Sequence, residues 1–257
     1  MINIHPTAIV NSEAEIGENV SVGPYTVIQG DVVIGDDCQI GSHVLIHSGT
    51  RVGKECRIFK GAVLGTDPQD LKYAGEQTTL EIGDETTVRE FCTLNRGSSH
   101  RFKTVIGSQT LLMAYVHIAH DCVIGNHVVL ANAVNMAGHV IIEDYVSVGG
   151  MTPIHQFVRI GKHSFIGGGL RVPKDVPPYI LAAGEPLNYE GINKVGLSRR
   201  GFSTETLIQL RRAYKLIYRS GLNVSQAIRQ IENTMELIPE IRDIINFIRA
   251  SERGIIK

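Results

Sequence analysis

Residues 16–41 read IGENVSVGPYTVIQGDVVIGDDCQIG, with an aliphatic side chain at every sixth position. The same phase runs without a slip over eleven hexads in residues 4–64 and over twelve hexads in residues 106–172, with three more hexads in residues 82–94. At a hydrophobic content of 43%, each long run would arise by chance about once in 10⁴ trials at a fixed phase. The repeat therefore decides the fold class.

A six-residue period fits neither the turn of an α-helix nor the alternation of an ordinary strand. It is typical of a β-solenoid, in which each hexad forms a short strand and a corner, and three hexads close one triangular coil. The aliphatic side chains fill the axis, and the glycine that often follows them, as at Gly17 and Gly125, is expected to ease the corner. By this three-hexad rule, equivalent positions on successive coils become vertical neighbours, about 4.8 Å apart.

The four cysteines show no CxxC pairing, and each follows the aliphatic residue of its hexad by four positions. Small side chains such as Ala or Val recur at that position in other hexads. The repeat therefore predicts that the cysteines are buried packing residues. They are Cys38, Cys56, Cys92 and Cys122.

Two stretches break the period, near residues 65–81 and 95–105, and both are predicted to be loop insertions. Loops that interrupt a regular solenoid are common sites of function. We therefore expect these two segments to contribute to a binding site.

The solenoid is predicted to end at Pro177 and Pro178, because proline cannot donate to a β ladder. This places a solenoid domain at 1–178 and a helical region at 179–257. Within that region Ser203 is a candidate N-cap of a helix that stops near residue 221, and two more helices are expected after it.

Composition and charge limit the partners of this chain. The formal net charge of -1 gives no global attraction to nucleic acid. No apolar run approaches the roughly 18 residues of a membrane span, and the N-terminal stretch MINIHPTAIV has neither a basic leader nor an apolar signal core. We therefore expect a cytoplasmic protein without stable membrane insertion.

Four histidines fall within about two coils of one another, in the segments HIAHDC, AGHV and IHQF. They are His117, His120, His139 and His155. The three-hexad rule places His120 in register with Gly138, and Asp121 in register with His139. A histidine with a pKa near about 6.5 suits proton abstraction from a hydroxyl, and a glycine N–H can stabilise an oxyanion. His120 and Gly138 fit these two roles.

Two other interpretations of the histidines remain open. They could be polar residues at coil corners, or they could bind zinc between subunits, as in the trimeric solenoid carbonic anhydrases that the repeat also resembles. The HIAH spacing differs from the spacing expected there, so no metal site is assigned. No GxSxG elbow occurs, so the sequence does not predict a serine nucleophile that would form a covalent intermediate.

Residues 193–219 contain seven basic residues and one acidic residue, a local charge of +6. Arg211, Lys215 and Arg219 are spaced by four and share one helical face. That face could receive an acidic carrier protein, or it could simply be solvated.

The longer motifs of the chain carry a family resemblance. They are PQDLKYAGE, NRG, HIAHDC, LAN, AGHV, GGM, HQF, DVPPY, RRGF and AYKLIYRSG, in this order. Together they resemble the UDP-N-acetylglucosamine acyltransferases, which begin lipid A synthesis, over essentially the whole chain. The resemblance implies a left-handed parallel β-helix with a small C-terminal α-helical region. It also implies a homotrimer with active sites in the clefts between neighbouring solenoids.

The resemblance further implies the reaction. An acyl chain, typically 3-hydroxylated, would pass from the phosphopantetheine of acyl carrier protein to the 3-position of UDP-N-acetylglucosamine, without a further cofactor. His120 would be the general base and the Gly138 N–H the oxyanion donor. Asp121 would orient His120, although adjacent residues on a strand normally point to opposite faces, so only a corner would allow this pairing.

The resemblance also assigns binding residues. Nine would bind the substrate: Asp70, Lys72, His117, His139, His155, Gln156, Asn193, Arg199 and Arg200. Gly168 stands where the family places the stop for the acyl tail, and its small size predicts a long chain, although the bulk of Phe165 nearby could shorten the groove. Val195 and Asn95 depart from the pattern of some family members, which leaves the nucleotide contacts open.

Three alternatives remain at this point. The acceptor could be the 3-amino analogue of the UDP-sugar, which would make the first link an amide. The chain could be a coenzyme A-dependent acetyltransferase, or a non-catalytic scaffold that uses its helices for docking. The later N-acyltransferase of the same pathway shares only the repeat and has an added N-terminal domain, for which this sequence leaves no room before residue 4.

Overall fold

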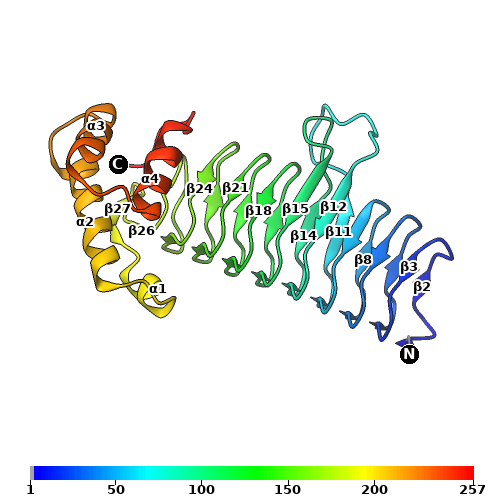
Figure 1. The fold of residues 1–257 in the computed structure, drawn as a ribbon. Coiled ribbons are helices and arrows are strands. Elements are labelled where there is room, and N and C mark those ends of the chain that lie inside the picture. The colour runs from blue at the N-terminus through cyan, green and yellow to red at the C-terminus, as the bar shows by residue number, and fades with distance from the viewer. Residues whose placement is uncertain (1–2) are drawn as a thin grey trace.

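The computed structural model describes residues 3–257, so residues 1 and 2 of the predicted solenoid domain lie outside the described residues. The chain forms a left-handed parallel β-helix with helices at its C-terminal end (Figure 1). This confirms the fold class that the repeat and the family resemblance predicted.

Three sheets form the walls of the β-helix, and each coil gives one strand to each sheet. The first sheet contains β1 (Asn3–Ile4), β4 (Ser21–Val22), β7 (Gln39–Ile40), β10 (Arg57–Ile58), β13 (Thr87–Val88), β16 (Leu111–Leu112), β19 (Val129–Leu130), β22 (Ser147–Val148), β25 (Phe165–Ile166), β26 (Ile180–Ala183) and β27 (Asn188–Ile192). The second contains β2 (Ile9–Val10), β5 (Val27–Ile28), β8 (Leu45–Ile46), β11 (Val63–Thr66), β14 (Thr93–Asn95), β17 (His117–Ile118), β20 (Asn135–Met136) and β23 (Pro153–Ile154). The third contains β3 (Glu15–Ile16), β6 (Val33–Ile34), β9 (Thr50–Val52), β12 (Thr79–Ile82), β15 (Lys103–Ile106), β18 (Val123–Ile124), β21 (Ile141–Ile142) and β24 (Arg159–Ile160).

The axis of the β-helix is a stack of aliphatic side chains, as the repeat predicted. Ile118 and Met136 are paired across adjacent coils, three hexads apart, and both are fully buried. The four cysteines are also buried and free. Burial raises the pKa of the Cys92 thiol to about 11, which agrees with a packing role.

The corner glycines have a different role from the one expected. The left-handed backbone of each corner belongs mostly to non-glycine residues three places after the aliphatic one, with a φ of 56° at both Asn19 and His43. A Cβ at Gly17 would instead lie 2.7 Å from the backbone nitrogen of Asp36 on the next coil. Glycine therefore permits close approach between coils, and the expectation that it eases the corner is not met.

The two breaks in the repeat are irregular loops at residues 67–78 and 96–102, and they project from the same region of the β-helix (Figure 1). They are shorter than predicted because β11, β12 and β15 are each four residues long. Their bases are tied together: Arg96 Nε donates to the Gly65 carbonyl at 2.8 Å, and Asn95 Nδ2 donates to Thr66 Oγ1 at 2.9 Å.

The ladder continues past Pro177 and Pro178, so the prediction that it ends there is wrong by one parallel strand. β26 pairs in parallel with β25, and β27 then turns back antiparallel to β26. The helices follow: α1 (Lys194–Arg199), α2 (Thr204–Arg219), α3 (Val224–Thr234) and α4 (Pro239–Arg249). The Ser203 hydroxyl caps α2 by accepting the Thr206 N–H at 3.0 Å, as expected. None of the helices in the described part is long and apolar enough to cross a membrane.

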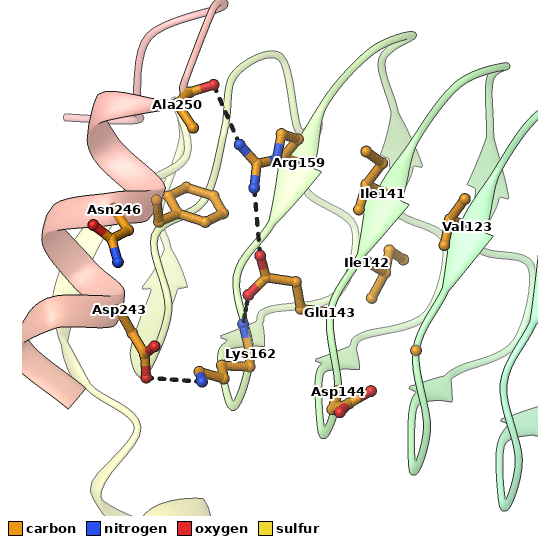
Figure 2. A pocket seen from close by; sticks show the side chains of 12 residues that line it. Val123, Ile141, Ile142, Glu143, Asp144, Arg159, Lys162, Asp243, Asn246 and Ala250 are labelled. Atoms are coloured by element: carbon orange, nitrogen blue, oxygen red, sulfur yellow. Dashed lines mark hydrogen bonds and ion pairs between the residues drawn. The ribbon is translucent and has the colours of Figure 1, made fainter. Parts of the chain in front are cut away.

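Helix α4 is fastened to the third sheet beside a cavity of about 570 Å³ (Figure 2). Lys162 Nζ lies 2.7 Å from Asp243 Oδ2, and Arg159 lies 3.5 Å from Glu143 and donates to the Ala250 carbonyl at 3.2 Å. Lys162, Asp243, Arg159 and Glu143 are thus held in ion pairs, Asp144 accepts the Asn126 N–H, and none of the residues assigned from the sequence lines this cavity. The candidate site lies elsewhere.

Candidate active site

His120 and Asp121 occupy the corner that follows β17. Asp121 has a φ of 60°, so the chain bends there and the two adjacent side chains turn toward each other. His120 Nδ1 lies 2.7 Å from Asp121 Oδ2. The corner thus provides the geometry on which the proposed pairing depended.

The Asp121 carboxylate is fully buried and well supplied with donors. Ser98 donates twice, from its backbone N–H to Oδ1 at 3.0 Å and from its hydroxyl to Oδ2 at 2.5 Å. The Arg101 N–H also donates to Oδ1, at 3.1 Å. Burial alone would raise the pKa of Asp121, but the hydrogen bonds from His120 and Ser98 outweigh burial and lower that pKa. Asp121 is therefore a carboxylate at neutral pH.

Gly138 lies directly over the His120 ring on the next coil. A Cβ at Gly138 would stand 2.8 Å from both His120 Cε1 and Nε2, so only glycine leaves room for the imidazole. No group among residues 3–257 accepts a hydrogen bond from the Gly138 N–H. Gly138 therefore packs against the side of the ring that carries Nε2, and its N–H has no partner in the described chain.

His139 extends the cluster. Its ring stacks on Phe157 at 4.5 Å and meets the rings of His120 and His100 edge-on. Burial is the main reason that the pKa of His139 is lowered, and the His120 charge adds to this effect, although Asp121 opposes it. The buried His139 Nδ1 has no hydrogen-bond partner in the described chain, which is uncommon for a buried polar atom.

The first loop brings Asp70 to the same place, with its Oδ2 3.9 Å from His120 Nε2. A cavity of about 390 Å³ opens here, and its walls include Asp70, Lys72, His139 and Gln156. Gln156 lies one coil beyond Gly138, as the three-hexad rule requires. The structure thus brings together seven of the assigned residues: Asp70, Lys72, His120, Asp121, Gly138, His139 and Gln156.

The other two histidines flank this cluster. His117 bonds through Nδ1 to Thr93 Oγ1 at 2.7 Å, and burial lowers its pKa. His155 is exposed and directs Nδ1 to the Gln156 carbonyl at 3.1 Å. Within residues 3–257, no hydrogen bond or ring contact joins either histidine to His120.

The remaining assigned residues lie apart from His120 within one chain. Asn193, Arg199 and Arg200 line a separate cavity of about 530 Å³ on the first sheet. Gly168 follows β25, and a Cβ there would meet the Gly150 carbonyl oxygen at 3.0 Å. A single chain does not bring these four residues to the histidine cluster.

The sequence comparisons match this chain to acyltransferases over its full length. It is 45% identical over 258 residues to the acyl-[acyl-carrier-protein]–UDP-N-acetylglucosamine O-acyltransferase of Thiobacillus denitrificans, covering all of both chains. It is 56% identical to the enzyme of the same name from Chlorobaculum tepidum, covering 96% of this chain and 94% of the relative. The chain belongs to the UDP-N-acetylglucosamine O-acyltransferase family.

Family models and solved structures agree with this membership. The model described as "Udp N-acetylglucosamine O-acyltransferase; Domain 2" matches residues 175–256, and the bacterial transferase hexapeptide model matches residues 13–48 and 103–138. The structure of LpxA, a UDP-N-acetylglucosamine acyltransferase from Bacteroides fragilis, is 47% identical with a TM-score of 0.97, covering 98% of this chain and 99% of that one. LpxA from Acinetobacter baumannii is also 47% identical, with a TM-score of 0.96 and 99% of both chains covered.

His120, Asp121 and His139 each offer an atom within 4.8 Å of the others, close enough in principle to hold a metal ion. However, Asp121 Oδ2 already accepts from the Ser98 hydroxyl and faces His120 Nδ1. A carboxylate that faces a histidine in this way is typical of acid–base catalysis. Such a pair agrees with the acyl transfer named for this family.

Sequence reasoning missed Ser98, His100 and Phe157. Phe157 follows His139 by three hexads, so the register could have placed it. Ser98 and His100 lie in the second loop, outside the repeat, where the register does not extend. The break in the hexapeptide repeat was the only sequence signal that this loop contributes to the site.

Proposed function

We propose that this chain transfers a 3-hydroxyacyl group from acyl carrier protein to the 3-hydroxyl of UDP-N-acetylglucosamine, the first step of lipid A synthesis. The family membership supports the reaction class. The observation that carries the mechanism is the His120–Asp121 pair beside the free Gly138 N–H.

In the proposed mechanism, His120 acts as the general base. Its Nδ1–H donates to the Asp121 carboxylate, which leaves the Nε2 lone pair to accept the proton of the sugar hydroxyl. The oxygen then attacks the thioester carbonyl, and the developing oxyanion is stabilised by the Gly138 N–H. When the C–S bond breaks, His120 returns the proton to the departing thiolate, and Asp121 stabilises the imidazolium in between.

The cavity beside His120 is polar, which supports a sugar as the acceptor. Asp70, Lys72, His139 and Gln156 offer donors and acceptors to its hydroxyl and acetamido groups. His117 and His155 would extend this cleft on either side. The 3-amino analogue would use the same base and the same oxyanion donor, so it remains the alternative acceptor.

The donor side is supported by a basic groove of about 480 Å³, whose walls include Lys194, Arg211, Lys215 and Arg219. None of these four side chains forms an ion pair among residues 3–257, so their charge is free for an acidic carrier protein. The carrier supplies its own phosphopantetheine, and we expect no further cofactor. The absence of a side chain at Gly168 favours a long acyl chain.

We further propose a cytoplasmic homotrimer with shared sites. Asn193, Arg199 and Arg200 line a cavity that shares no residue with the one beside His120, so a neighbouring subunit would supply them to bind the nucleotide or carrier phosphates. Arg200 lies over the Tyr145 ring at 5.3 Å, which holds its guanidinium at the surface of the first sheet.

The function is tested by incubating the purified protein with 3-hydroxyacyl carrier proteins of about 10 to 16 carbons and each UDP-sugar, with products read by mass spectrometry. We expect acyl-UDP-sugar from the wild type and a loss of about 10³-fold or more in His120→Ala, because the base is removed. His5→Ala, in the first coil, is the matched control. Preference for the shortest chain would contradict the assignment of Gly168, and no transfer to either sugar would favour the coenzyme A or scaffold alternative.

A further inference from the structure

We propose that Ser98 is a positioning residue that keeps Asp121 ionised and directed at His120. The inference rests on the proposed function, because it concerns the same acid–base pair. It assigns a role to the second loop that the resemblance did not assign.

The loop at 96–102 folds over Asp121 and supplies donors to both carboxylate oxygens. Oδ1 accepts two backbone N–H groups, from Ser98 and Arg101, at 3.0 and 3.1 Å. Oδ2 accepts the Ser98 hydroxyl at 2.5 Å and lies 2.7 Å from His120 Nδ1. The Ser98 hydroxyl is thus bonded to the same oxygen that orients the base.

This arrangement allows one hydrogen bond to be removed without dismantling the rest. Ser98→Ala keeps the two backbone donors to Oδ1 and the Thr104 hydroxyl, which accepts the Asp121 N–H at 2.9 Å. The substitution also removes the acceptor of the His100 N–H, which lies 3.3 Å from the Ser98 hydroxyl near the loop surface. The variant therefore probes chiefly the bond to Oδ2.

The expected direction follows from the charge on Asp121. A buried carboxylate that loses a donor holds its negative charge less favourably, so the His120–Asp121 pair should take up its proton at higher pH. The other ionisable groups around the pair stay in place: Asp70 near His120 Nε2, His139 near Asp121, and His100 and Arg101 near His139. A change in the pH profile would thus report the missing hydroxyl.

The test measures acyl transfer against pH for the wild type, Ser98→Ala, Ser98→Thr and Ser164→Ala. Ser164 is the matched control, because its buried hydroxyl donates to the Gly161 carbonyl at 2.7 Å away from the site. For Ser98→Ala we expect kcat to fall about tenfold with little change in KM, and the acidic limb to move up by roughly 0.5 to 1 pH unit. Ser98→Thr should restore most of kcat, and Ser164→Ala should match the wild type. A wild-type kcat and pH profile in Ser98→Ala would overturn the proposal.

A second measurement separates this inference from the proposed function. The imidazole nitrogens of His120 can be titrated by NMR in the labelled protein, with His120→Ala used to assign the signals. An upward shift of the His120 titration in Ser98→Ala supports the role of Ser98 even if no acyl transfer occurs, and an unchanged titration overturns it. If Ser98→Ala does not fold, Ser98→Cys replaces it, because a thiol fills the space but donates weakly.

Discussion

Next to His120, the left-handed backbone of Asp121 allows two neighbouring side chains to point toward each other. On a strand, His120 and Asp121 would point to opposite faces, but the positive φ of Asp121 brings them within 2.7 Å. The same corner leaves Gly138 beside His120 Nε2. The proposed base, its orienting carboxylate and the proposed oxyanion donor therefore all depend on the backbone of two corners.

Gly138→Ala should abolish most activity while the protein stays folded. The new Cβ would stand 2.8 Å from the His120 ring, so the imidazole must move away from the reacting hydroxyl. We expect a fall in kcat of about 10²-fold or more, measured at saturating sugar. In Gly30→Ala, the control, the Cβ comes closest to the flexible Glu13 carboxylate, and activity should be retained. Full activity in Gly138→Ala would contradict the proposed geometry.

Another corner carries an aromatic ladder that runs along the β-helix to its helical end. The rings of His127, Tyr145, His163 and Tyr179 stack in order at 4.5, 4.7 and 5.6 Å. All of these ladder residues have a positive φ. Tyr179 then donates its hydroxyl to Asp243 of α4 at 2.6 Å, so the ladder joins the coils to the last helix.

The ladder should make stability depend on pH. Burial, with the nearby Arg200 charge, lowers the pKa of His163 to about 4, while the unfolded chain titrates near about 6.5. The unfolded state therefore binds more protons between these values, so stability is full above about pH 6.5 and falls as the pH drops toward 4. We expect the free energy of unfolding to fall by about 2 kcal/mol between pH 8 and 5 from this group.

Denaturant unfolding at several pH values checks this expectation. His163→Phe keeps the ring but removes the titrating group, so it should lose that part of the pH dependence. Tyr145→Phe, on the same ladder, should keep it. Identical pH dependence in His163→Phe and the wild type would show that His163 is not responsible.

For the whole molecule, the sequence predicted the fold and the side chains that stack within the repeat. It did not predict contacts made by segments outside the repeat. The vertical partners of His120 and Asp121 followed from counting three hexads. The continuation through β26 could not be counted, because Leu181 pairs with Phe165 although the two are less than three hexads apart. The hydrogen bonds from Ser98 to Asp121 join the second loop to a corner of the β-helix. No repeat or local sequence motif predicts such a contact.

Shared sites predict complementation between inactive chains. If His120 comes from one subunit and Arg199 with Arg200 from its neighbour, a trimer that mixes His120→Ala chains with Arg199→Ala/Arg200→Ala chains contains some intact sites. We expect activity about a quarter of the wild-type value in an equal mixture that is unfolded and reassembled, by random association of the chains. Light scattering should give three copies of the 28.1 kDa chain. No recovery of activity would indicate that each site belongs to one chain.

The coil of three hexads works like a reading frame. A single residue inserted between His120 and Gly138 would shift every later side chain by one place and turn the core outward. The loops at 67–78 and 96–102 leave the ladder at the paired strands β11 and β14 and re-enter it at the paired strands β12 and β15, so their length lies outside that frame. Evolution can therefore change the length of these two loops more readily than the spacing of the hexads that sets His120 against Gly138, as long as the loop residues that line the cavity, Asp70, Lys72 and Ser98, stay in place.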